Sequence, residues 1–287
     1  MEAIEVASGV IAFIRPDEGA NAGLIRTDEG IVVVDTTSCG ADMRALLDAV
    51  DVSPAEVCLA INTHLHSDHT WGNQVFDCPI LAHRLCRETM EANLEGPWKL
   101  ADIRISIDER ATSDPQWAAE MRKKIEGLEI TLPTETFEDR RDLQSGERRI
   151  EVIHFGGHTP GSLVVWLPGE KVLFSGDLLF VERYPFIGDA DIPDLMSALK
   201  RLSQFGAHVI VPGHGPLCGE HEIRALLAYL QGTWERTIDH LALGDTADEA
   251  AVDSSYPRYA EGAAERYHER NIRTMFEKLV GGETCPL

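Results

Sequence analysis

The chain has 287 residues and a formal net charge of −22, with 48 Asp and Glu against 26 Lys and Arg. So acidic a protein is poorly suited to hold the phosphate backbone of a nucleic acid, which binds through lysine and arginine. No run approaches the roughly 18 to 20 consecutive apolar residues that cross a bilayer, and the N-terminus does not resemble a secretory signal. The six cysteines form no CxxC pair, which favours reduced thiols. We therefore expect a cytoplasmic protein that binds neither nucleic acid nor membrane.

The first third of the chain predicts a hairpin-rich sheet followed by a helix. Three short β-rich runs are separated by Asp-Glu-Gly turns, and we expect strands at 10–15, 22–26 and 31–35. Apolar residues then recur at helical spacing over 42–50. The nearly continuous apolar run VCLAINT at 57–63 is typical of a buried strand.

The middle segment, 84–145, is polar and lacks a strong core pattern. Helical periodicity appears at 84–94 and 116–128, and the residues between them have no assignment. We interpret 84–145 as a helical insertion in a single domain that spans 1–287. Such segments often form lids or substrate walls, although a dimer contact or structural padding is an equally open interpretation.

Alternating strands and helices resume after the insertion. The apolar runs predict strands at 150–155, 163–167, 172–175 and 208–211. Helices are expected at 192–205, 220–243 and about 259–279, with a C-terminal helical extension at 244–287. This alternation favours α and β elements packed in layers.

A compact group of ligand-type side chains follows the buried strand at 57–63. The segment INTHLHSDHTWGN contains His64, His66, Asp68 and His69 within six residues. Side chains two apart in an extended segment share a face, so His64 and His66 can point to one place. Crowding these groups after a buried strand would be costly unless a metal ion paired with them. The cluster therefore predicts metal binding.

Three later residues follow or end apolar strands and complete the ligand set. His158 lies in HFGGHTPGS, Asp177 in VLFSGD and His214 in VIVPGHGP. Binding sites in layered α/β folds collect beyond the carboxyl ends of strands. His83 and His154 also lie near strand ends, but neither has a glycine-rich turn, and we interpret both as structural.

The four motifs HLHSDH, GGHTPGS, FSGD and PGHGP, in this order, resemble the metallo-β-lactamase superfamily. The resemblance implies a four-layer αββα sandwich with metals at one rim between the sheets. It also implies a first metal held by three histidines, a second metal held by Asp68 and two histidines, and one carboxylate between them. The implied ligands are His64, His66 and His158 for the first metal, Asp68, His69 and His214 for the second, and Asp177 as the bridge.

Asp177 also indicates a branch of this superfamily. True β-lactamases usually have Cys or Ser there, so the site resembles hydroxyacylglutathione hydrolases and lactonases instead. The stretches WGN (71–73), PFIGDADI (185–192) and YHERNIRTMFEKL (267–279) resemble the group labelled cyclase-like or quinoprotein-relay metallohydrolases. That label defines no substrate.

These resemblances imply a dinuclear metal-dependent hydrolase acting on a small carboxylic ester, thioester or lactone. Two divalent ions, zinc first and iron or manganese as alternatives, would make a bridging hydroxide available near neutral pH. Asp177 would set the metal spacing, and Asp68 would orient the nucleophile or pass a proton. Arg183 and Tyr184 are candidate substrate contacts, although an ion pair with Glu182 or Asp189 is as good an interpretation of Arg183.

Two other activities and the oligomeric state of the protein stay open. The same metals support hydrolysis of a small phosphodiester, and a persulfide dioxygenase-like enzyme would use one iron instead. A small molecule is the expected partner, and a homodimer remains open.

Overall fold

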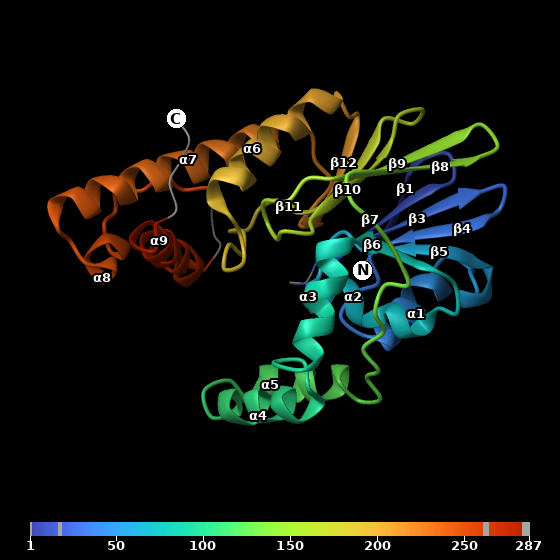
Figure 1. The fold of residues 1–287 in the computed structure, drawn as a ribbon, viewed down its shortest axis with the longest axis horizontal. Coiled ribbons are helices and arrows are strands. Elements are labelled where there is room, and N and C mark those ends of the chain that lie inside the picture. Colours follow the sequence, from blue (N-terminus) through green and yellow to red (C-terminus); the bar gives the residue numbers. More distant parts are fainter. Residues whose placement is uncertain (1, 17–18, 261–263, 283–287) are drawn as a thin grey trace.

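A computed structural model describes residues 2–16, 19–260 and 264–282 of the chain. Two β-sheets face one another, and helices cover their outer faces (Figure 1). This arrangement confirms the predicted four-layer αββα sandwich of the metallo-β-lactamase type.

The first sheet contains seven strands in chain order, β1 to β7. Strands β1 to β4 pair antiparallel through short turns, and β4 to β7 pair parallel. Its strands are β1 (Glu2–Ala7), β2 (Val10–Ile14), β3 (Ala22–Thr27), β4 (Gly30–Val34), β5 (Val57–Ile61), β6 (Ile80–His83) and β7 (Glu135–Phe137).

The second sheet has the order β12-β11-β10-β9-β8. Strands β8 to β11 are antiparallel neighbours, whereas β11 and β12 are parallel. Its strands are β8 (Arg140–Ser145), β9 (Arg148–His154), β10 (Leu163–Leu167), β11 (Val172–Phe180) and β12 (Val209–His214). Strand β11 runs five residues beyond the expected end at Ser175, so Asp177 lies inside a strand.

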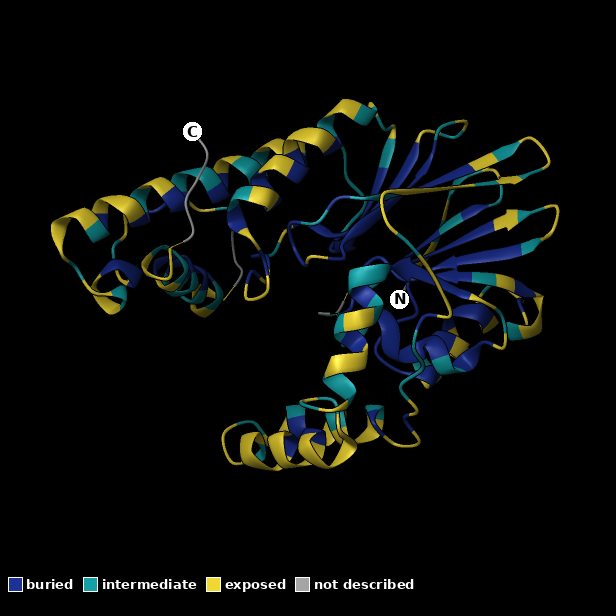
Figure 2. Cartoon of the chain, in the orientation of Figure 1, coloured by how far each residue is buried: buried dark blue, intermediate teal, exposed yellow. Residues whose placement is uncertain are grey.

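Three apolar layers hold the sheets and helices together, and the facing sheet surfaces are buried (Figure 2). Val32 and Ile61 from the first sheet pack with Val165 and Phe174 from the second. Burial of such side chains contributes roughly 1.5–3 kcal/mol each. The outer layers and their connecting turns contain α1 (Gly40–Asp48), η1 (Pro54–Glu56), α2 (Ser67–Thr70), η2 (Trp71–Val75), α6 (Ile192–Leu202), η3 (Ser203–Phe205) and α7 (Glu220–Leu243).

The segment after β6 forms an arm of three helices, α3 (Arg84–Leu94), α4 (Leu100–Ala111) and α5 (Pro115–Lys124). Helix α4 occupies the stretch that had no assignment, and α5 ends four residues before the predicted helix does. The helices of this segment end before residue 145, and β7 and β8 within 84–145 belong to the two sheets. Their outer positions leave many side chains exposed, so the sequence there lacks apolar alternation.

The C-terminal helices continue from α7 through α8 (Ala247–Ala251) to α9 (Glu265–Val280). They share a small core that includes Tyr256, Ile272 and Phe276. Helix α9 begins six residues later than the expected 259. Within the described ranges, no helix is both long enough and apolar enough to cross a bilayer.

Candidate metal centre

The three histidines predicted to share one metal come together with Asp177. His64 lies on the loop after β5, His66 caps the N-terminus of α2, and His158 lies on the turn between β9 and β10. His66 Nδ1 is 3.0 Å from His64 Nε2 and 3.1 Å from His158 Nε2. Asp177 Oδ2 lies 3.6 Å from His64 Nε2 and 3.5 Å from His158 Nε2.

Asp68, His69 and His214 form a second group beside the first. Asp68 and His69 lie on the short helix α2, and His214 is the last residue of β12. His214 Nε2 is 3.2 Å from Asp68 Oδ2, and His69 Nε2 is 3.8 Å from the same oxygen. The structure therefore brings together all seven residues that the sequence predicts as ligands.

Asp177 lies between the two groups. Its Oδ1 is 3.0 Å from His69 Nε2, and its Oδ2 is 3.5 Å from His214 Nε2. The backbone of Gly213 passes so close that a Cβ there would lie 1.9 Å from Asp177 Oδ1. Only glycine leaves room for this carboxylate where the pairing of β11 and β12 is irregular.

Burial and charge divide the histidines into two kinds. Burial lowers the pKa of His64 well below its ordinary value and that of His158 to about 3. Burial also opposes charge on His69 and His214, but the nearby carboxylates together outweigh it: Asp177 with Asp35 and Asp68 at His69, and Asp177 with Asp68 at His214. They raise the pKa of His214 to about 9 and that of His69 well above its ordinary value. His64 and His158 thus offer neutral imidazoles, while His69 and His214 hold protons that a metal would displace.

The arrangement fits divalent metal ions. A tetrahedral ion with bonds of about 2.0–2.1 Å separates its ligand atoms by roughly 3.3 Å, near the spacings above. His69 Nε2 and Asp177 Oδ1 are both buried and lie 3.0 Å apart, a spacing at which two ligand atoms can share one ion. A metal there would take the place of the proton that His69 holds.

Two carboxylates beside the ligands were not predicted from the sequence as partners of the ligand histidines. Asp35, directly after β4, lies 2.8 Å from His69 Nδ1 and accepts hydrogen bonds from the backbone and hydroxyl of Thr63, both at 2.7 Å. Asp189 lies 2.8 Å from His66 Nε2. Such partners fix the orientation of a ligand ring and raise its basicity. The position of Asp35 at the end of a predicted strand could have indicated its role. Asp189 lies near His66 only because of the fold, and no local pattern marks it.

Replacing Asp35 with asparagine is expected to weaken metal binding by roughly 10- to 100-fold, because the ring of His69 loses its negatively charged partner. Competition with a chromophoric chelator would measure the affinity. Asp48→Asn, on the exposed side of α1, is the matched control and should leave the affinity unchanged. Equal affinities in the two variants would contradict the assignment.

Acidification is expected to remove metal first from the group of Asp68, His69 and His214. Protons compete with a metal wherever the pH lies below the ligand pKa, and the pKa is raised at His69 and His214 but lowered at His64 and His158. Elemental analysis between pH 8 and pH 5 should therefore show loss of one metal, while the metal held by His64 and His158 is retained. This loss should be absent in His214→Ala; its persistence there would refute the order.

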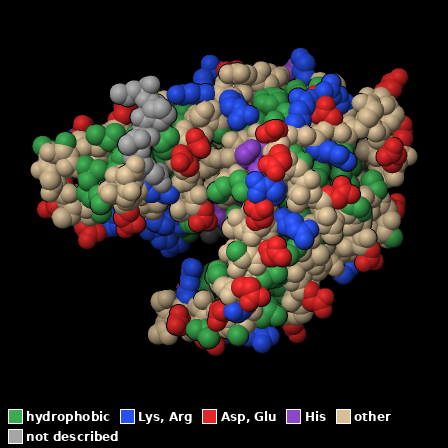
Figure 3. All heavy atoms as spheres, viewed as in Figure 1, with side chains coloured by type: hydrophobic (Ala, Val, Ile, Leu, Met, Phe, Trp, Pro, Cys, Tyr) green, Lys and Arg blue, Asp and Glu red, His purple; other side chains and the backbone are tan. Residues whose placement is uncertain are grey.

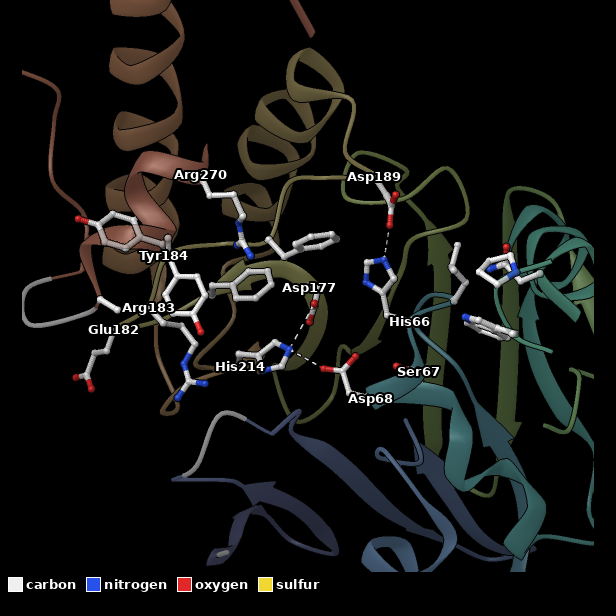
Figure 4. A pocket seen from close by; sticks show the side chains of 18 residues that line it. His66, Ser67, Asp68, Asp177, Glu182, Arg183, Tyr184, Asp189, His214 and Arg270 are labelled. Atoms are coloured by element: carbon white, nitrogen blue, oxygen red, sulfur yellow. Dashed lines mark hydrogen bonds and ion pairs between the residues drawn. The ribbon is translucent and has the colours of Figure 1, made fainter. Parts of the chain in front are cut away.

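The two groups face a cavity of about 810 Å³. One wall is the α3–α4 turn with Pro97 and Trp98, and the other includes Arg183, Tyr184 and α9 (Figure 4). The surface is hollowed between the helical arm and the C-terminal helices (Figure 3). Both predicted substrate contacts thus line the cavity, although the ring of Tyr184 is buried.

His83 and His154 lie outside both ligand groups. Their rings stack on one another, with centroids 3.8 Å apart and an angle of 7° between the planes. His83 accepts a hydrogen bond from the Leu85 backbone, and a ring nitrogen of His154 lies 2.8 Å from the Pro160 carbonyl. These contacts agree with a structural role.

Sequence comparison finds a family model and a relative that each match most of the chain. A family model described as the metallo-beta-lactamase superfamily matches residues 15–214. The chain is 28% identical over 220 residues to the acyl-coenzyme A thioesterase MBLAC2 of Bos taurus, covering 70% of this chain and 75% of that protein.

Two solved structures are similar in fold. The sec-alkylsulfatase Pisa1 from Pseudomonas sp. has a TM-score of 0.75 at 18% identity, covering 98% of this chain. The chain spans 50% of that protein's length. A metallo-beta-lactamase from Pontibacter korlensis has a TM-score of 0.60 at 23% identity, covering 80% of this chain and 98% of its own.

Proposed function

Because the chain belongs to the metallo-β-lactamase superfamily and is a metal-dependent hydrolase, we propose that it hydrolyses a small thioester with two metal ions. The observation that carries the proposal is the position of Asp177 between two adjacent ligand groups. Carboxylic esters and lactones react by the same attack on a carbonyl and belong to the same proposal. The similarity to an acyl-coenzyme A thioesterase supports our choice of a thioester as the first candidate.

Two divalent ions held there would lower the pKa of a bound water and polarise the substrate carbonyl. Asp177, whose carboxylate contacts ligands of both groups, would help to hold both ions. Asp68 reaches the cavity, and its partly exposed carboxylate is placed to orient the attacking water and accept its proton. His66 is held in place by Asp189, so one ligand stays fixed on the open side of the site.

The cavity favours a substrate larger than an acetyl ester. Its volume of about 810 Å³ lies in the range of sites that enclose drug-sized ligands. Trp98 and Phe186 contribute apolar surface for an acyl chain. A phosphodiester or an alkyl sulfate would place its charged centre at the same metals and is the alternative to be tested.

The test joins elemental analysis to a substrate panel. The purified protein would be assayed for metal content and against acyl thioesters, lactones, aryl esters, bis-aryl phosphodiesters and alkyl sulfates. We expect two metal ions per chain and the highest kcat/KM on an acyl thioester. One iron per chain, together with oxygen-dependent persulfide consumption, would replace the proposal with a redox enzyme. A preference for phosphodiesters or sulfates would keep the metal centre and reject the carbonyl substrate.

A further inference from the structure

Helix α9 forms part of the cavity wall although it lies beyond the 15–214 match to the family model. Tyr267 and Arg270 line the cavity from this helix. Asn271 donates a 2.9 Å hydrogen bond to the carbonyl of Pro185, which ties α9 to the loop that carries Phe186. The wall is therefore anchored to the same loop that bounds the metal centre.

Arg270 is a partly buried cation held between aromatic rings. Its guanidinium carbon lies 5.1 Å from the ring centre of Tyr267 and 5.3 Å from that of Phe186. Burial lowers the pKa of Arg270 from its ordinary value, so its charge is poorly solvated. Figure 4 shows the side chain extending from α9 into the cavity that Asp177 and His214 also face.

No carboxylate of a described residue forms an ion pair with Arg270. Arg273, one turn further along α9, pairs with Asp248 and Glu269. In a chain with 48 acidic and 26 basic residues, an arginine inside a cavity without such a partner is unusual. Four carboxylates line the cavity. Asp68 and Asp177 belong to the ligand groups, Asp189 pairs with His66, and Glu182 forms no ion pair with Arg270 in the described part of the chain.

We infer that Arg270 binds an anionic oxygen group of the substrate, separate from the bond that is hydrolysed. The flat guanidinium offers paired N–H donors that match a carboxylate, a sulfonate or a phosphate. Cation–π contacts with the rings of Tyr267 and Phe186 restrain the guanidinium without using its N–H donors as an ion pair would. This inference rests on the proposed function, because it assumes that the scissile carbonyl lies at Asp68 and Asp177.

The inference also orients the substrate. Its anionic end would lie against α9, and its apolar part against Pro97 and Trp98 on the helical arm. The substrate class is then an amphiphilic thioester or ester with an acidic substituent. A neutral acyl ester of the same size would use only the apolar wall.

The experiment compares Arg270→Gln with wild type on matched substrates. One is a phenyl thioester whose acyl chain ends in a carboxylate, one has that carboxylate methylated, and one ends in a sulfonate. Three chain lengths locate the best spacing. We expect Arg270→Gln to lower kcat/KM by roughly 10- to 100-fold on the anionic thioesters and by less than about 3-fold on the neutral one. The carboxylate and sulfonate series then identify the preferred anion.

Three further variants make the result specific. Arg270→Lys keeps the charge and should recover part of the loss. Arg224→Gln, at an exposed arginine of α7 that pairs with Glu220, is the control and should change neither substrate. An equal loss on the neutral and anionic thioesters would make Arg270 merely structural. If Arg183→Gln removed the preference for anionic over neutral thioesters and Arg270→Gln did not, the anion would bind at Arg183. That result would overturn the inference.

Binding separates this inference from the proposed function. Calorimetry with a non-hydrolysable thioether carrying the same carboxylate would compare metal-loaded wild type with metal-loaded Arg270→Gln. We expect a loss of affinity of roughly 10-fold or more. If no thioester is hydrolysed but this loss is observed, only the proposed reaction fails. Equal affinities would overturn the role of Arg270 whatever the reaction.

Discussion

Asp177→Ala is expected to lower hydrolysis on the order of 1000-fold or more while the protein still folds. The carboxylate contacts both ligand groups, so its loss removes the link that fixes two metals at one distance. The fold should persist because the apolar layers around β11 do not depend on this side chain. The measurements are kcat on the best thioester, metal content and thermal unfolding.

The control for this variant is Asp239→Ala, which removes an exposed carboxylate from α7. It should keep both the activity and the metal content of wild type. Metal content in Asp177→Ala should fall below two per chain. Turnover that survived in Asp177→Ala would rule out the dinuclear mechanism, provided that the variant is folded.

Removal of the metals is expected to abolish turnover and to lower the midpoint of thermal unfolding by about 8 to 16 °C. A ligand at about 1,000 times its Kd stabilises the native state by roughly 4 kcal/mol. In large domains about 1 kcal/mol shifts the midpoint by 2–4 °C. Chelation followed by calorimetry and assay would measure both effects.

Return of metal gives the control for this second prediction. Two equivalents of Zn²⁺ should restore both stability and activity, whereas Mg²⁺ should not, because it prefers oxygen ligands in octahedral geometry. Full activity after one equivalent would contradict a two-metal reaction. An unchanged unfolding midpoint after complete metal loss would contradict the stabilising role.

The ligands were predictable because they lie within buried apolar strands or shortly after them. His64 and His158 each follow an apolar run, and such runs are visible without knowledge of the fold. The outer strands β7 and β8 were not predictable, since their exposed side chains carry no apolar alternation. Helix α4 escaped because few of its residues are buried.

The residues that surround the ligands were harder to predict than the ligands themselves. Asp35 is a single carboxylate after a strand, and only the packing of β4 beside β5 brings it to His69. Arg270 lies on an amphipathic helix, and neither the periodicity of that helix nor the resemblance of 267–279 to other metallohydrolases indicated a cavity residue. Its place in the cavity depends on how α9 packs against the 185–186 loop, which no local pattern encodes.

The position of α9 late in the chain sets an order of assembly during synthesis. The last metal ligand is His214, whereas Arg270 is made only afterwards. Translation adds roughly 5–20 residues per second, so the ligand set is made some seconds before its cavity wall. A nascent chain halted between these two points would carry every metal ligand but lack α9. Metal uptake and substrate selection could therefore be separated in time on the ribosome.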